Sequence, residues 1–130
     1  MNPYLFEMVK LALSAMKNAY VPSSGFAVGA CLRTVGGELF SGCNFENASF
    51  PLSLCAETSA IASMVSAGYY QIQEIVVTAK MLSLCPPCGG CRQRLVEFST
   101  NDTIVHLYGD GKIQESIPIA TLLPHQFQLT

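Results

Sequence analysis

Three cysteines and one glutamate stand at a spacing that suits a metal centre. Cys55 precedes Glu57 by two positions, and Cys88 and Cys91 follow later in the chain, three positions apart. Both segments stand where the sequence predicts a helix to begin, and a helix N-terminus stabilises the thiolate form of cysteine, the form that binds zinc. Three thiolates leave the fourth tetrahedral position open for water, as in catalytic zinc sites. The spacing therefore predicts a zinc centre with one open position.

Glu57 supplies the acid–base group that such a centre would use. Zinc lowers the pKa of a bound water toward neutrality, and a nearby carboxylate can take the proton and return it to a departing group. Cys55 and Glu57 can both reach the metal region only from the first turn of one helix. We therefore expect zinc-assisted hydrolysis with Glu57 as the catalytic residue.

The elements that position these residues alternate after an opening hairpin. Apolar periodicity and turn residues predict a first helix that ends near Asn18, helices over 54–67 and 88–98, and strands over 26–35, 38–43, 74–79 and 103–108. Ile113, Ile117 and Ile119 mark a further short segment, and the stretch 122–127 is left without a class. This order predicts an α/β fold, a three-layer α/β/α sandwich with a mixed sheet.

Composition limits the possible partners. A chain of 130 residues and 14.0 kDa has the size of one domain, here 1–130. Hydrophobic residues make up 50% and charged residues 12%, which is apolar enough to favour self-association. The net charge of −2 comes without a basic run, so the chain lacks the positive patch that would bind a nucleic-acid backbone.

The first helix is amphipathic rather than uniformly apolar. Glu7, Lys10 and Lys17 interrupt its apolar positions, which argues against a signal peptide or a membrane span. We therefore expect a cytoplasmic protein with no membrane partner. In a reducing compartment its six cysteines would be thiols or metal ligands rather than disulfides.

Several segments resemble the cytidine deaminase family. They are 26–30 (FAVGA), 42–49 (GCNFENAS), 54–57 (LCAE), 87–91 (PCGGC) and 122–124 (LLP). The two cysteine segments match the zinc deaminase signature, a Cys two positions before Glu and a later Pro-Cys-x-x-Cys. The resemblance implies one Zn²⁺ per chain and hydrolytic conversion of cytidine and deoxycytidine to uridine and deoxyuridine, a step of pyrimidine salvage.

The same resemblance implies roles for residues around the metal. Asn44 and Glu46 would bind the ribose hydroxyls, and Phe26 would line the pocket beside the nucleoside. The backbone of Ala56 would hold the edge of the pyrimidine ring, and the carbonyl of Pro86 would face the leaving ammonia.

The resemblance also implies an assembly. Family members are homotetramers in which a C-terminal aromatic side chain enters the site of a neighbouring subunit and stacks on the base. Phe127 is the residue at that position, although it would serve equally well in core or interface packing.

Two positions depart from the family pattern. Many members with three cysteine ligands carry an arginine directly after the catalytic glutamate, where this chain has Thr58. Three thiolates on Zn²⁺ leave a formal charge near −1, and Arg92, next to Cys91, is the candidate to offset it. Ser23-Ser24 stands where the family usually has a tyrosine.

Other interpretations remain open at this point. Clustered cysteines often bind structural zinc, as in a non-catalytic binding module. Cys85 could join Cys88 and Cys91 in an iron–sulfur site, but Leu95 replaces the next expected cysteine, and the pair Cys85 and Cys88 could form a redox dithiol. A deaminase of modified cytosine nucleosides, of the blasticidin type, would share the zinc motif. Glu46 could be a solvated loop carboxylate.

Overall fold

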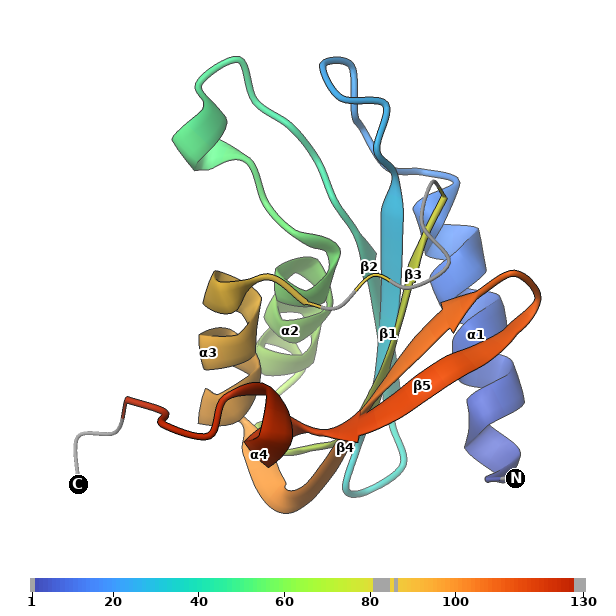
Figure 1. Cartoon of the computed structure of the whole chain (residues 1–130), viewed down its shortest axis with the longest axis vertical. Helices are drawn as coiled ribbons and strands as arrows, with labels where there is room; N and C mark the ends of the chain where they lie inside the picture. Colours follow the sequence, from blue (N-terminus) through green and yellow to red (C-terminus); the bar gives the residue numbers. More distant parts are fainter. Residues whose placement is uncertain (1, 81–84, 86, 128–130) are drawn as a thin grey trace.

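A mixed five-stranded sheet lies between layers of helices in the computed structural model, which describes residues 2–80, 85 and 87–127 (Figure 1). The elements are α1 (Pro3–Met16), β1 (Val28–Thr34), β2 (Leu39–Cys43), the 3-10 turn η1 (Phe50–Leu52), α2 (Ala56–Ser66), β3 (Ile72–Ala79), α3 (Gly89–Glu97), β4 (Ser99–Gly109), β5 (Lys112–Pro118) and α4 (Ile119–Leu122). The strand order is β2-β1-β3-β4-β5, with β3 and β4 parallel and the other pairs antiparallel.

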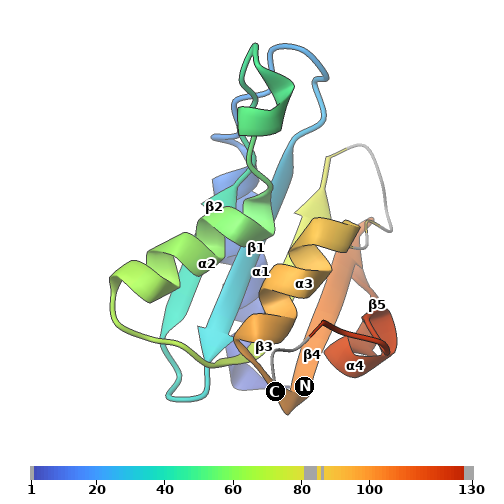
Figure 2. The same cartoon turned by 90° about the vertical axis from the view of Figure 1, so that its left-hand side faces the viewer.

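The sheet is buried on both faces because its central strands present apolar residues to each side. Val76 of β3 packs with Met8 of α1, whereas its neighbours Ile75 and Val77 belong to the cluster that contains Met64 of α2. Figure 2 shows α2 and α3 side by side on the face opposite α1. Burying one such side chain fully stabilises the fold by about 1.5–3 kcal/mol. The three-layer α/β/α sandwich predicted from the sequence is therefore confirmed.

The last strand is the element that the sequence pattern described least well. Residues 112–118 pair antiparallel with β4, and a register shift interrupts this pairing between Leu107 and Tyr108. Because β5 is an exposed edge strand with a bulge beside it, its apolar residues do not alternate cleanly. β4 also begins earlier than expected, at Ser99. Within the described part of the chain, no helix is long and apolar enough to cross a membrane.

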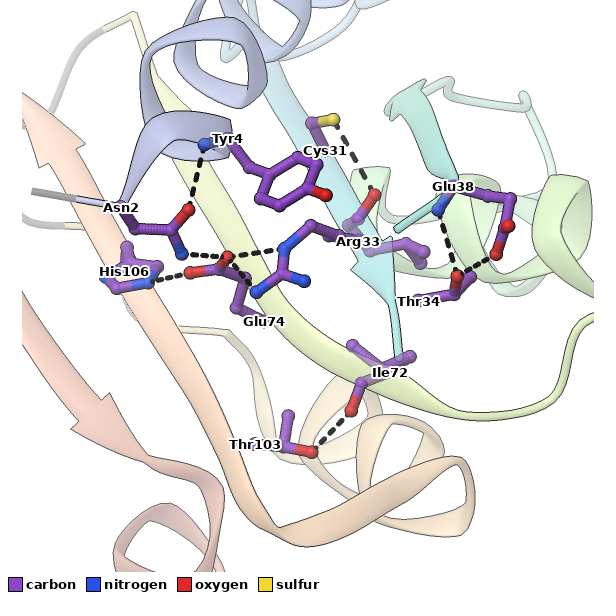
Figure 3. Close-up of polar contacts among 11 residues, drawn as sticks. Asn2, Tyr4, Cys31, Arg33, Thr34, Glu38, Ile72, Glu74, Thr103 and His106 are labelled. Atoms are coloured by element: carbon purple, nitrogen blue, oxygen red, sulfur yellow. Dashed lines mark hydrogen bonds and ion pairs between the residues drawn. The ribbon is translucent and has the colours of Figure 1, made fainter. Parts of the chain in front are cut away.

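A buried polar network fixes α1 to the sheet on the face away from α2 and α3 (Figure 3). Glu74 of β3 accepts hydrogen bonds from Arg33 Nε at 2.7 Å and from the Asn2 side chain, and it contacts His106 Nε2 at 2.8 Å. Burial opposes ionisation of this carboxyl, but these hydrogen bonds hold the pKa of Glu74 below its usual value. Removing one partner of such a buried pair costs about 3–5 kcal/mol.

Gly42 allows α2 to lie directly against β2. A Cβ atom at this position would lie 2.5 Å from the backbone nitrogen of Ala60, 2.6 Å from Cβ of Ser59 and 2.9 Å from the carbonyl oxygen of Ala56. Real Cβ atoms do not approach backbone this closely. The absence of a side chain on β2 therefore sets the position of the first turn of α2.

We predict that Gly42→Ala destabilises the protein by about 1–3 kcal/mol, because α2 must shift to relieve the overlap. Denaturant unfolding measures this loss directly. Gly36→Ala is the matched control, since its added methyl would meet the movable Glu38 carboxylate. Equal stability of the Gly42→Ala protein and the control would contradict this account of the α2–β2 contact.

Candidate metal centre and active site

Two helix N-termini present the three cysteines predicted as ligands. Cys55 is the N-cap residue of α2, Cys88 is the N-cap residue of α3, and Cys91 lies in the first turn of α3. Paired backbone hydrogen bonds of 3.0 and 2.9 Å between Phe45 and Leu54 close the preceding loop and set the position of Cys55. In this structure the three ligand atoms lie within 4.8 Å of one another.

The geometry of the sulfurs fits zinc. With Zn–S bonds of about 2.3 Å, the corners of a regular tetrahedron lie about 3.8 Å apart. The Cys55 and Cys88 sulfurs are separated by 3.8 Å. Soft thiolate ligands also favour zinc over hard cations such as Mg²⁺ or Ca²⁺. The three cysteines would hold the metal next to a pocket that Cys55 and Cys88 help to line.

The surroundings of Cys55 and Cys91 change the pKa values of their thiols in opposite directions. The hydrogen bond between Cys55 and Cys91 lowers the pKa of Cys55 and raises the pKa of Cys91, and burial raises the pKa of Cys91 further. Cys91 is completely buried. Because zinc binds thiolates, binding must displace the proton that Cys91 retains.

Glu57 lies beside the sulfurs and is almost completely shielded from solvent. It is the second residue of α2, with 4% of its surface exposed. Burial raises the pKa of its carboxyl, although hydrogen bonds with its own backbone and with Cys91 partly oppose this effect. A carboxyl with a raised pKa exchanges protons more readily near neutral pH than an ordinary one. Glu57 is therefore suited to carry a proton.

One pocket brings most of the predicted site residues together. Its volume of about 380 Å³ lies in the range of small-molecule sites. The lining residues are Phe26, Val28, Asn44, Phe45, Glu46, Ser53, Leu54, Cys55, Ala56, Glu57, Cys85 and Cys88. Four predicted substrate-binding residues thus share a cavity with two of the three metal-ligating cysteines and with Glu57.

Asn44 and Glu46 hold the wall of this pocket through hydrogen bonds to the loop before β1 and to the first residue of β1. Asn44 Nδ2 donates to the Phe26 carbonyl at 2.8 Å, and Asn44 Oδ1 accepts from the Val28 N–H at 2.9 Å. The Glu46 carboxylate accepts from the hydroxyl and N–H of Ser24 and from the N–H of Ser23. The hydrogen bond from Ser24 lowers the pKa of Glu46, so this carboxylate is charged.

The sequence matches known proteins over most of its length. Residues 5–107 match the family described as the cytidine and deoxycytidylate deaminase zinc-binding region. The chain belongs to this deaminase family. It is 42% identical to the cytidine deaminase of Halalkalibacterium halodurans, covering 92% of this chain and 91% of that protein. It is 38% identical to the cytidine deaminase of Mycoplasma genitalium, covering 93% of each.

Solved structures of the deaminase family match the fold closely. Cytidine deaminase from Burkholderia pseudomallei superposes with a TM-score of 0.87 and 37% identity, covering 94% of this chain and 98% of that one. Cytidine deaminase from Mycobacterium tuberculosis superposes with a TM-score of 0.84 and 32% identity, covering 96% of this chain and 98% of that one. The family resemblance, the zinc cofactor and the deaminase class predicted from the sequence are therefore confirmed.

Arg92, predicted to offset the charge of the thiolates, donates hydrogen bonds to two backbone carbonyls. Its Nε donates to the Pro87 carbonyl at 3.0 Å and its Nη1 donates to the Leu122 carbonyl at 3.3 Å, which fastens the segment before α3 and the end of α4. The contact with a ligand sulfur comes instead from Thr58, whose Oγ1 lies 3.6 Å from Cys91 Sγ and accepts from Arg94. Sequence reasoning missed Arg94, although its position three residues after Cys91 places both on one helix face.

Phe127, predicted to reach the site of a neighbouring subunit, does not line the pocket of its own chain. The Phe127 side chain is 70% exposed, and its carbonyl accepts from Gln93 Nε2 at 3.2 Å, which ties the C-terminal segment to α3. Pro86, predicted to face the leaving ammonia, lies outside the described residues.

We predict that Cys88→Ser abolishes stoichiometric zinc binding, because a serine hydroxyl does not ionise to replace a thiolate ligand. Metal analysis of the purified protein measures the content. Cys85→Ser is the matched control: Cys85 lines the pocket but does not belong to the three-sulfur cluster that the described residues form. Zinc loss in the control, or iron in the wild-type protein, would instead favour a site that includes Cys85.

Proposed function

We propose that the protein deaminates cytidine and deoxycytidine by hydrolysis, giving uridine or deoxyuridine and ammonia. The observation that carries this proposal is the buried Glu57 beside three clustered cysteine sulfurs at a pocket of a size that suits a nucleoside. The names of the close relatives support the same substrate.

Glu57 would perform the proton transfers of the reaction. Zinc, when bound by Cys55, Cys88 and Cys91, supplies activation of a water molecule as the nucleophile. The Glu57 carboxylate takes one proton from that water and delivers it to ring nitrogen N3 as the C4–O bond forms. It then passes the second proton to the exocyclic amine as the C4–N bond breaks. The balance is cytidine plus water to uridine plus ammonia.

The pocket wall would orient the nucleoside. The Asn44 amide and the charged Glu46 carboxylate stand at positions where hydroxyl groups of a ribose could be held, and Phe26 provides an apolar surface beside them. Ala56 begins α2, so its backbone N–H has no partner within the helix and is free to meet the ring edge. By family resemblance, the carbonyl of Pro86 would face the leaving amine.

We further propose a cytoplasmic homotetramer in which residues 1–130 form one catalytic domain, acting in pyrimidine salvage without nucleic-acid or membrane partners. Exposed aromatic and apolar side chains support the assembly. Phe50 and Leu52 lie on the loop between β2 and α2, Tyr20 lies beside that loop, and Phe127 lies near the C-terminus; all four are more than 60% exposed. A second copy of the chain would cover them and bring Phe127 to a neighbouring pocket.

We predict that Glu57→Gln retains zinc but loses turnover by about 10²–10⁴-fold, because the amide cannot carry protons. The fall in ultraviolet absorbance on conversion of cytidine to uridine measures turnover, and metal analysis measures zinc. Glu97→Gln makes the same change at an exposed residue of α3 and should behave as wild type. Substantial activity of Glu57→Gln, or a zinc-loaded wild-type protein inactive on cytidine and deoxycytidine, would contradict the proposed function.

The shared site makes a separate prediction about mixed subunits. Phe127→Ala alone should raise KM for cytidine because base stacking is lost. When Phe127→Ala and Glu57→Gln subunits are denatured and refolded together, some sites combine an intact Glu57 with an intact Phe127 from a neighbour. Such mixtures should recover the low KM of wild type. Kinetics no better than those of separately refolded subunits would place Phe127 outside the shared site.

A further inference from the structure

The zinc site concentrates negative charge in a buried place. Three thiolates on Zn²⁺ leave a formal charge near −1, and the Glu57 carboxyl adjoins them. The N-termini of α2 and α3 each supply about half a positive charge. Cys91 is completely buried, so water cannot solvate its sulfur from outside. Additional hydrogen bonds to sulfur are the usual means of stabilising such a centre.

Thr58 and Arg94 form a chain of two contacts that ends on the Cys91 sulfur. Arg94 Nη1 donates to Thr58 Oγ1 at 3.1 Å, and that oxygen lies 3.6 Å from Cys91 Sγ. A guanidinium has no acceptor, so the first contact can run only from arginine to threonine. A metal-bound thiolate has no proton, so the hydroxyl must donate in the second contact. When the metal is bound, both hydrogen bonds therefore run in one direction, from Arg94 to Thr58 and from Thr58 to the Cys91 sulfur.

The helix α3 is built to let Arg94 reach this position. Arg94 follows Cys91 by three residues, so the two side chains share a helix face. A Cβ atom on Gly90 would lie 3.7 Å from Arg94 Nη1, which shows that the guanidinium folds back along the first turn of the helix. Because Arg94 is exposed, it reaches the site without the desolvation cost of a buried cation.

We propose that Arg94, acting through the Thr58 hydroxyl, is a positioning residue that withdraws negative charge from the Cys91 thiolate. In this relay from Arg94 through Thr58 to Cys91, the positive charge comes from α3. Many family members instead carry an arginine directly after the catalytic glutamate, where this chain has Thr58. The relay rests on the zinc centre of this protein and not on the identity of the nucleoside. Its loss weakens zinc retention and lowers kcat, with KM little changed.

Zinc transfer to a chromogenic chelator tests the relay without any substrate. We expect Thr58→Val, which removes the hydroxyl at constant shape, to lose zinc about 10-fold faster than wild type, at the low end of the effect of such outer contacts. The conservative variants Thr58→Ser and Arg94→Lys should retain zinc almost as well as wild type, whereas Arg94→Gln should lose zinc faster than wild type. The double variant Thr58→Val/Arg94→Gln should be no worse than Thr58→Val alone.

Cobalt substitution provides a spectroscopic readout that a purely structural role would not change. A hydrogen bond lowers the energy of the sulfur lone pairs, so its removal moves the thiolate-to-cobalt charge-transfer band to longer wavelength. We expect this shift in Thr58→Val and a smaller one in Arg94→Gln. Lys112→Gln removes one exposed positive charge on β5 and is the control that should leave both band and zinc retention unchanged.

Additive effects of Thr58→Val and Arg94→Gln would overturn the proposal, because independent contributions are incompatible with action through one hydroxyl. A cobalt band that moves in Arg92→Gln but not in Arg94→Gln would overturn it as well and would assign the compensating charge to Arg92. A wild-type protein with no deaminase activity toward cytidine would refute the proposed function, but the zinc-transfer and cobalt measurements would still test the role of Arg94.

Discussion

The gathering of three thiolates and a carboxylate at one point is the constraint on which the rest of the structure depends. Like charges at this distance repel, and their burial removes the water that would otherwise stabilise them. The metal offsets most of the charge, and the peptide dipoles of α2 and α3 offset part of the remainder. Both helices must therefore begin at the same place. The topology of the sheet is what makes this possible.

The parallel pairing of β3 and β4 aligns the two helices. Each helix precedes one of these strands and runs antiparallel to it, so α2 and α3 run in the same direction and start at the same edge of the sheet (Figure 2). That edge is the carboxyl end of the parallel strands, where α/β folds commonly place their ligands. Gly42 on β2 then sets how closely the start of α2 approaches the sheet. The polar network around Glu74 stabilises the opposite face and leaves this edge free for chemistry.

The metal motif could be predicted from the sequence because its chemistry depends on residue type and on spacing within single turns. Cys55, Glu57, Cys88 and Cys91 carry this information locally, and helix start signals stand beside them. Contacts between elements do not leave such a signal. Arg92 is adjacent to a ligand in sequence yet binds the Pro87 carbonyl, whereas Arg94 reaches Thr58 across two helices.

The same limit applies to the loops and edges of the fold. Ser23-Ser24 was notable in the sequence only as a departure from the family pattern. In the fold both residues donate to the Glu46 carboxylate, a contact between loops that are far apart in the chain. The edge strand β5 was missed because a bulge and solvent exposure remove the alternation on which strand prediction relies. The Glu46 contact and the edge strand both depend on pairing between segments distant in the sequence, which local sequence patterns do not record.

Two carboxylates line one pocket, and their surroundings move their pKa values in opposite directions. Burial raises the pKa of Glu57, whereas the hydrogen bond from Ser24 lowers the pKa of the partly exposed Glu46. A group that must gain and lose a proton in each cycle benefits from the first environment, and a group that only accepts hydrogen bonds from a sugar benefits from the second. The Ser24 hydroxyl also accepts from the Phe26 N–H, so the contact that keeps Glu46 ionised sets the adjacent pocket wall as well. In the proposed reaction, solvation and hydrogen bonding would therefore separate proton transfer by Glu57 from sugar binding by Glu46, although both residues are glutamates.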